Sequence, residues 1–148
     1  MARKVWIISG PAGVGKSTTA RRLAQDMKKS AYVSGDDISH MAVSGRERPW
    51  ESEQANDLVW KNIVALTENF VEAGYDVVVD WVSFWQDVKR YTAHWIEQGI
   101  EVRYVILWAD QDVQSNVINA GRARRRWGSG SSYCEMSFEA RVHQNATT

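Results

Sequence analysis

The residues best suited to do chemistry lie near the N-terminus, where positions 10 to 17 read Gly-Pro-Ala-Gly-Val-Gly-Lys-Ser. Glycines permit backbone angles that side chains hinder, so successive N–H groups of such a loop can converge on phosphate oxygens. The lysine would reach the β- and γ-phosphates of a nucleotide, and the following hydroxyl would ligate Mg²⁺. The predicted nucleotide contacts are Gly10, Ala12, Gly13, Val14, Gly15, Lys16, Ser17 and Thr18.

The flanking sequence gives this loop the context that its mechanism requires, a strand before it and a helix after it. Residues 5–9 form an apolar run rich in branched side chains, which is typical of a strand buried on both faces of a parallel sheet. Apolar residues then recur at helical spacing at Ala20, Leu23, Ala24 and Met27. The alternative is a glycine-rich turn that precedes Lys-Ser by chance. We expect the loop to bind ATP with Mg²⁺.

An aspartate, Asp80, directly follows the apolar run 77–79. Ligands of open α/β sheets bind beyond the carboxyl ends of the strands, and P-loop proteins place a carboxylate there for Mg²⁺. We predict that Asp80 holds the metal with Ser17, directly or through water. The alternative is an aspartate that caps a helix or forms a turn.

Two further aspartates, Asp36 and Asp37, follow a predicted short strand at residues 31–34. They would lie at the same edge of the sheet as the glycine loop. A carboxylate there could accept the proton of a hydroxyl that attacks the γ-phosphate. We predict Asp36 as this catalytic base or as a substrate anchor and Asp37 as the cap of the next helix, although either aspartate suits a cap.

The rest of the chain alternates strands with helices. Helical spacing marks residues 51–73 and 84–98, and short apolar runs mark strands at residues 76–80 and 102–108. Such alternation indicates right-handed βαβ crossovers around a parallel sheet. The sequence therefore predicts an α/β P-loop NTPase with a three-layer, doubly wound parallel sheet in one domain.

The composition narrows the possible partners and the compartment. The chain of 148 residues has 18 basic and 18 acidic side chains, so no global field favours nucleic acid or an anionic membrane. It has a single cysteine, which suits a reducing compartment. We expect a cytoplasmic protein with a small-molecule substrate, without nucleic-acid or membrane partners. Its oligomeric state cannot be read from the sequence.

Several stretches between residues 9 and 80 resemble the P-loop small-molecule kinases, the group around gluconate kinase, shikimate kinase, chloramphenicol phosphotransferase and the nucleoside monophosphate kinases. The matching stretches are SGPAGVGKST at 9–18, GD at 35–36, RPWES at 48–52, WKNI at 60–63 and VVVD at 77–80. The resemblance implies ATP-dependent phosphorylation of a hydroxyl, with Asp36 facing the substrate and Arg46, Arg48 or Trp50 near the acceptor. For the two arginines, solvated loop charge is the competing interpretation.

The resemblance leaves the acceptor open among gluconate-like sugar acids, nucleotides, shikimate-like alcohols and antibiotics. An alternative function is a non-enzymatic or degenerate protein that binds nucleotide and has lost turnover. A GTP switch is disfavoured, because the sequence has no Asn-Lys-x-Asp run for guanine.

The C-terminal part departs from these kinases, which carry an arginine-bearing lid, often near Met-Gly-Glu-Arg, and then a helix, a strand and a final helix. Codons for WGSG at 127–130, read one base earlier, can encode Met-Gly-Glu-Arg, and those for NVIN at 116–119 can encode Arg-Asp-Gln-Arg. We therefore predict a kinase-like domain at residues 1–115. Residues 116–148 would be a truncated or altered lid and tail, produced by a frameshift that begins between about residues 110 and 116.

Resequencing of the gene should reveal this frameshift as an alternative frame that encodes a lid and a terminal helix. An unbroken frame, with no such alternative, would contradict it.

Replacing Lys16 with Ala should abolish detectable nucleotide affinity and leave the fold intact, because the charge that meets the phosphates is lost. The measurement is the thermal midpoint with and without saturating Mg²⁺·ATP. At a hundred times its dissociation constant, a ligand stabilises the folded state by about 2.7 kcal/mol. The wild type should shift accordingly, whereas an equal shift in Lys16→Ala would contradict the assignment.

Overall fold

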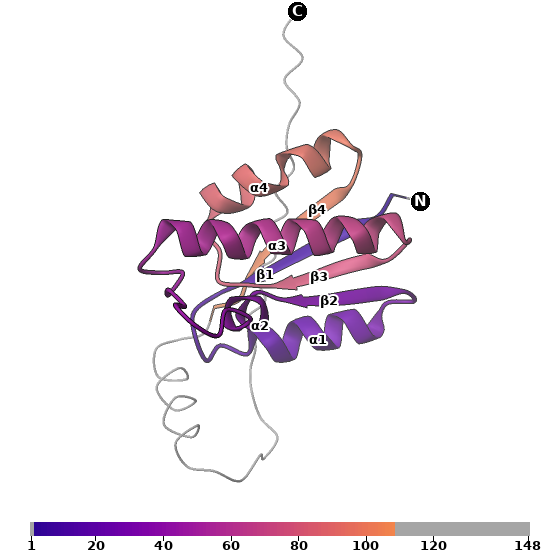
Figure 1. The fold of residues 1–148 in the computed structure, drawn as a ribbon. Helices are drawn as coiled ribbons and strands as arrows, with labels where there is room; N and C mark the ends of the chain where they lie inside the picture. Colours follow the sequence, from indigo (N-terminus) through magenta and orange to yellow (C-terminus); the bar gives the residue numbers. More distant parts are fainter. Residues whose placement is uncertain (1, 109–148) are drawn as a thin grey trace, which may run out of the picture.

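A computed structural model describes residues 2–108 of the chain. The predicted boundary near residue 115, the frameshift and the tail at 116–148 lie outside these residues. Four strands pair in parallel in the order β2-β3-β1-β4 (Figure 1). The strands are β1 (Lys4–Ser9), β2 (Ser30–Ser34), β3 (Asp76–Asp80) and β4 (Glu101–Ile106).

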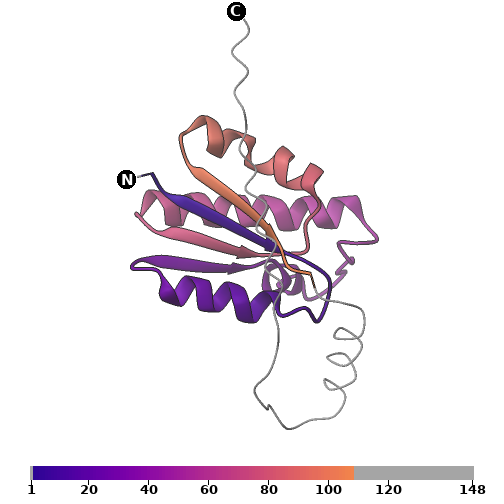
Figure 2. The same cartoon turned by 180° about the vertical axis from the view of Figure 1, so that it is seen from behind.

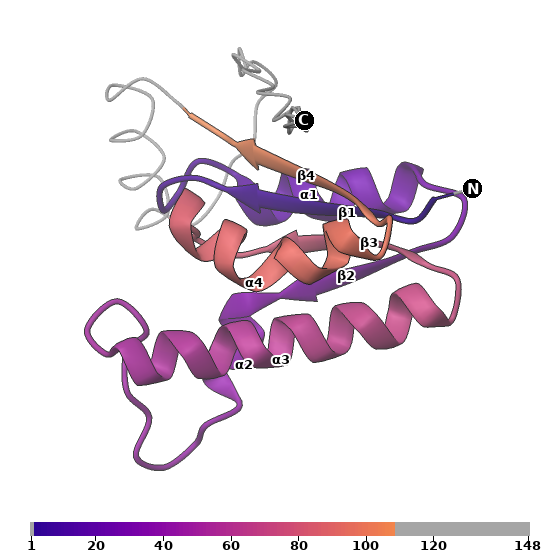
Figure 3. The same ribbon diagram turned by 90° about the horizontal axis from the view of Figure 1, so that it is seen from above.

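Helices cover both faces of this sheet, which confirms the predicted α/β architecture with three layers. They are α1 (Lys16–Asp26), α2 (Gly35–His40), α3 (Glu53–Glu72) and α4 (Trp85–Glu97). Figures 1 and 2 show opposite sides of the molecule, and Figure 3 shows the sheet between α1 and the pair α3 and α4. None of these helices is both long and apolar enough to span a membrane.

The core consists of two apolar clusters, one on each face of the sheet. Alternation along a strand divides the side chains, so Val77 and Val79 face α3 and α4 whereas Val78 faces α1. Trp60 of α3 and Trp95 of α4 are completely buried in the larger cluster. Burial on both faces explains why β1 and β3 read as continuous apolar runs.

The predicted cap of α2 is wrong, because the helix begins earlier than expected. Ser34 occupies the N-cap position, and its hydroxyl accepts a hydrogen bond of 3.1 Å from the Asp37 N–H. Asp36 and Asp37 therefore both lie in the first turn, where their negative charges interact favourably with the positive end of the helix dipole. Serine and aspartate are both favoured as N-cap residues, so the sequence pattern did not distinguish Ser34 from the two aspartates that follow it.

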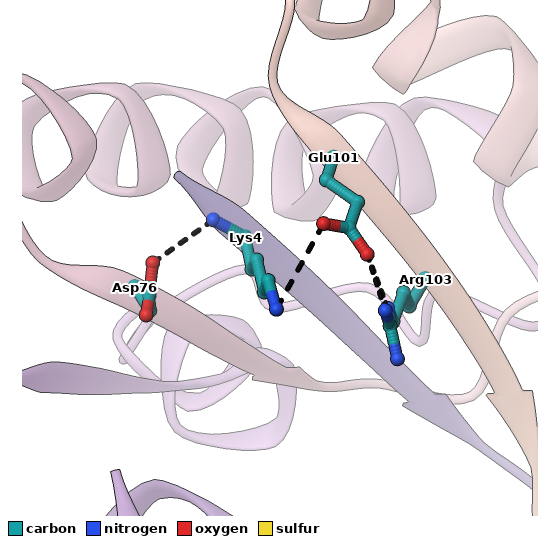
Figure 4. Close-up of polar contacts among 4 residues, drawn as sticks. All are labelled: Lys4, Asp76, Glu101 and Arg103. Atoms are coloured by element: carbon teal, nitrogen blue, oxygen red, sulfur yellow. Dashed lines mark hydrogen bonds and ion pairs between the residues drawn. The ribbon is translucent and has the colours of Figure 1, made fainter. Parts of the chain in front are cut away.

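Polar contacts join three strands at the amino-terminal end of the sheet (Figure 4). The Lys4 N–H donates to Asp76 Oδ1 at 2.9 Å, and Lys4 Nζ lies 3.9 Å from Glu101 Oε2. Glu101 also accepts a hydrogen bond of 2.6 Å from Arg103 Nε. Partly exposed ion pairs contribute about 0–1 kcal/mol, so these contacts support the register more than the stability. The glycine loop follows β1 at the opposite end of the sheet.

Gly35→Ala should destabilise the fold by about 1–3 kcal/mol, the usual cost of overpacking. A Cβ at Gly35 would lie 2.3 Å from Cε3 of the buried Trp81 ring. Urea unfolding measures the loss. In a Trp81→Leu background the added cost should be clearly smaller, because Gly35 and the Trp81 ring are in contact and changes at contacting residues are not additive. A full cost in that background would show that the ring is not the cause.

Candidate functional site

The predicted phosphate loop connects β1 to α1 and follows a path that glycine permits. Its glycines have positive φ angles of 144° at Gly10, 79° at Gly13 and 94° at Gly15. Gly10 also lies against the end of β4, where an added Cβ would be 2.4 Å from the Leu107 carbonyl oxygen. The chain that leaves β1 can therefore pass this close to Leu107 only with glycine at position 10.

The N-terminus of α1 carries no competing negative charge. Gly15 is the N-cap residue and provides no side-chain hydrogen bond, and the first turn contains no acidic residue. The initial N–H groups and the helix dipole thus remain available to an anion. Lys16 lies at the same point, with its Nζ donating to the Pro11 carbonyl at 3.0 Å. Ser17 and Thr18 follow in the first turn and are exposed. This is the geometry of a phosphate-binding helix terminus.

Asp80 ends β3 at the same edge of the sheet. It is only 4% exposed, and its Oδ2 accepts a hydrogen bond of 2.8 Å from the Tyr32 hydroxyl. Burial raises the pKa of Tyr32, as does the bond to Asp80, while the neighbouring Ser17 hydroxyl and the Arg21 guanidinium lower it. Tyr32 therefore remains a protonated donor at neutral pH. The arrangement places Asp80, Tyr32 and Ser17 together.

Sequence reasoning identified Asp80 and Ser17 but missed Tyr32. Within the strand, Tyr32 reads as one more large apolar residue, and its contact with Asp80 comes from a different strand, 48 positions along the chain. No local spacing in the sequence signals such a contact.

A second missed group is a buried network that holds the chain where it leaves β3. The Ser9 hydroxyl accepts from the Ser83 N–H at 2.9 Å and donates to the Ser83 carbonyl at 3.0 Å. The Tyr104 hydroxyl donates to the same carbonyl at 2.7 Å. These bonds join β1 and β4 to the loop after Asp80, so they fix the edge of the sheet on which the site lies.

Asp36 lies in the first turn of α2, directly after this edge. It follows the end of β2, where Ser34 pairs in register with Asp80, and its side chain is exposed. Asp36 is thus exposed near the carboxyl edge, on the helix that follows β2, the strand next to β3 and Asp80.

A cavity of about 510 Å³ lies beside α2, between the loop at 41–50 and the first part of α3. Its lining is mainly apolar, with Ser39, Arg46, Glu47, Gln54 and Asn62 as the polar members. Arg46 is held in place because its Nε donates to the Ser39 carbonyl at 2.9 Å and its Nη2 donates to the Ser39 hydroxyl at 3.1 Å.

The three predicted acceptor residues do not lie together. Arg46 lines the cavity, whereas Arg48 and Trp50 are outside its lining. Arg48 pairs with Glu51 at 3.2 Å and lies 5.9 Å from the centre of the Trp50 ring, which is 72% exposed. Arg46 is therefore fixed at the cavity, whereas Arg48 and Trp50 lie apart from it at the surface.

The donor set near Ser17 fits Mg²⁺. A hydroxyl and a carboxylate are hard oxygen donors, and protein sites for Mg²⁺ usually supply only one or two ligands beside the phosphates of a substrate. No group of three or more His, Cys, Asp or Glu side chains within residues 2–108 could hold a metal by itself.

A parallel sheet with a glycine loop leading into an uncapped helix defines a P-loop kinase-like fold. The sequence profile of the AAA_33 family, described as an AAA domain, matches residues 5–141. The chain belongs to this family of P-loop kinases, which confirms the resemblance inferred from the loop and its flanking elements. No protein of curated function matches the chain.

Solved structures share the fold at low sequence identity. The APS kinase CysC of Mycobacterium tuberculosis, in complex with AMPPNP and APS, is 20% identical over 84% of this chain and 73% of its own, with a TM-score of 0.61. A gluconokinase from Sinorhizobium meliloti 1021 is 14% identical over 82% and 66%, with a TM-score of 0.60.

A third structure, of a Pnkp1/Rnl/Hen1 complex, is 16% identical with a TM-score of 0.57. The alignment covers 99% of this chain and 48% of that one, so this chain spans about half the length of that neighbour. All three likenesses establish the fold alone.

Proposed function

We propose that the protein transfers the γ-phosphoryl group of ATP to a hydroxyl of a small molecule. The observation that carries this proposal is the N-terminus of α1, which has no side-chain cap and begins with Lys16. It follows a loop whose glycines have positive φ angles, at the edge of the sheet where Asp80 ends β3. Family membership and the kinases among the structural neighbours support it.

The loop N–H groups and Lys16 would hold the β- and γ-phosphates and stabilise the charge of the transferred group. Ser17 and Asp80 would hold Mg²⁺, which would neutralise the negative charge that develops on the phosphates. Thr18, exposed in the first turn, would contact the α-phosphate side.

Asp36 would accept the proton of the acceptor hydroxyl as its oxygen bonds to the γ-phosphorus. The bond from that phosphorus to the bridging oxygen breaks at the same time, and ADP leaves with the electron pair. An exposed carboxylate on α2, the helix whose Ile38 and Ser39 line the cavity, suits the task.

The cavity beside α2 is our proposed acceptor site. Its apolar lining favours an acceptor with an apolar side, and Arg46 is the lining residue able to meet an anionic group. Arg48 and Trp50 would contact the acceptor only where it extends beyond the cavity. The lining gives more contact to an amphipathic alcohol than to a fully hydroxylated sugar acid.

The division of the chain near residue 115 stays a prediction. The AAA domain match extends to residue 141 and thus crosses the predicted boundary. The cytoplasmic location and the absence of nucleic-acid partners likewise stay predictions.

ADP release with Mg²⁺·ATP, measured across sugar acids, nucleosides and amphipathic alcohols, tests the function. With an acceptor that turns over, Asp36→Asn should lower kcat about 10²- to 10⁴-fold, the usual contribution of a general base, without weakening ATP binding. Asp37→Asn is the matched control, since Asp37 is also exposed and lies in the same helical turn. Equal rates in both variants would exclude Asp36 as the base.

ATP binding without acceptor-dependent ADP release would favour the alternative of a nucleotide-binding protein that has lost turnover. Absence of ATP binding would exclude both functions.

A further inference from the structure

Tyr32 occupies the point where β2, β3 and α1 meet. It lies on the face of the sheet that packs against α1, among apolar residues that include Ile8 and Val78. Its hydroxyl donates to Asp80 Oδ2 at 2.8 Å, and the guanidinium carbon of Arg21 lies 4.3 Å from the centre of its ring. The phenol is therefore held on both sides, by the sheet beneath it and by α1 above it.

The hydrogen bond from Tyr32 engages one oxygen of the Asp80 carboxylate. Among residues 2–108, Tyr32 is the donor found for the Asp80 carboxylate. A carboxylate with one engaged oxygen cannot rotate freely, so the orientation of its second oxygen is determined as well. Partners of this kind, which orient a metal ligand from behind, typically change metal affinity or activity 10- to 100-fold when they are removed.

We propose that Tyr32 is a positioning residue for the metal, which orients the Asp80 carboxylate toward the Mg²⁺ that accompanies the nucleotide at Ser17. The inference rests on the proposed function, because it assumes that Mg²⁺·ATP binds at the phosphate loop. It adds a residue that belongs neither to the glycine loop nor to the carboxylates.

The competing role for Tyr32 is purely structural, as a donor that satisfies a buried carboxylate. The two roles predict different behaviour. A structural donor contributes to stability whether or not Mg²⁺ is present, whereas a positioning residue changes the strength with which Mg²⁺ enhances ATP binding.

Tyr32→Phe separates the two roles, because phenylalanine keeps the ring that packs against the sheet and Arg21 and removes only the hydroxyl. The readout is the dissociation constant for ATP with Mg²⁺ and with EDTA, measured by calorimetry. We expect Tyr32→Phe to weaken ATP binding about tenfold with Mg²⁺ and to leave it unchanged in EDTA. Equal constants for the wild type and the variant under both conditions would overturn the positioning role, as would an equal loss under both.

Two further variants sharpen the test. Asp80→Asn should remove the Mg²⁺-dependent part of the affinity, and Tyr32→Phe added to it should cost nothing more, because both act through the same carboxylate. Additive losses would overturn the inference. Tyr91→Phe is the matched control, since Tyr91 also donates to an aspartate, Asp57, at 2.6 Å, but lies on α4 at the opposite face of the sheet.

Failure of the inference can be told apart from failure of the proposed function. A wild type that does not bind ATP would overturn both. A wild type whose ATP binding strengthens with Mg²⁺, together with an unaltered Tyr32→Phe, would overturn the role of Tyr32 alone.

Discussion

Parallel pairing of β1 with strands on both of its sides is the constraint on which the site depends. In this register Ile8 lies opposite Asp80 of β3, and Ser9 lies opposite Ile106 of β4. Parallel strands end at a common edge, so the glycine loop after β1 emerges beside the carboxylate that ends β3. A shift of one residue would turn the Asp80 side chain to the other face of the sheet, away from α1.

Buried hydrogen bonds and close backbone contacts hold the carboxyl edge of the sheet in place. Ser9 forms both a donor and an acceptor bond with the Ser83 backbone, and Leu107 approaches Gly10 so closely that a methyl group would not fit. Buried hydrogen bonds gain their importance from the cost of leaving either partner unsatisfied. The phosphate loop is thereby placed relative to β3 and β4 before any ligand arrives, which favours electrostatic stabilisation in a preorganised site.

The two faces of the sheet differ in the size of the apolar core that they carry. The face under α3 and α4 carries the larger core, with two fully buried tryptophans. The face under α1 carries a smaller cluster, and it is there that Tyr32, Asp80 and Ser17 meet. The cavity beside α2 is a separate compartment, with Arg46 as its fixed cation.

Much of the fold followed from the sequence alone, because its signals are local. The loop pattern at 10–17 and the alternation of apolar runs with helical spacing depend on residues close together in the chain. The cap of α2 was mistaken because serine and aspartate meet the same local requirement. The bonds of Tyr32 to Asp80, of Ser9 to Ser83 and of Tyr104 to Ser83 join residues 48, 74 and 21 positions apart. Strand order and register determine which side chains meet across such separations. Both are properties of the packed sheet, so only the tertiary structure decided these contacts.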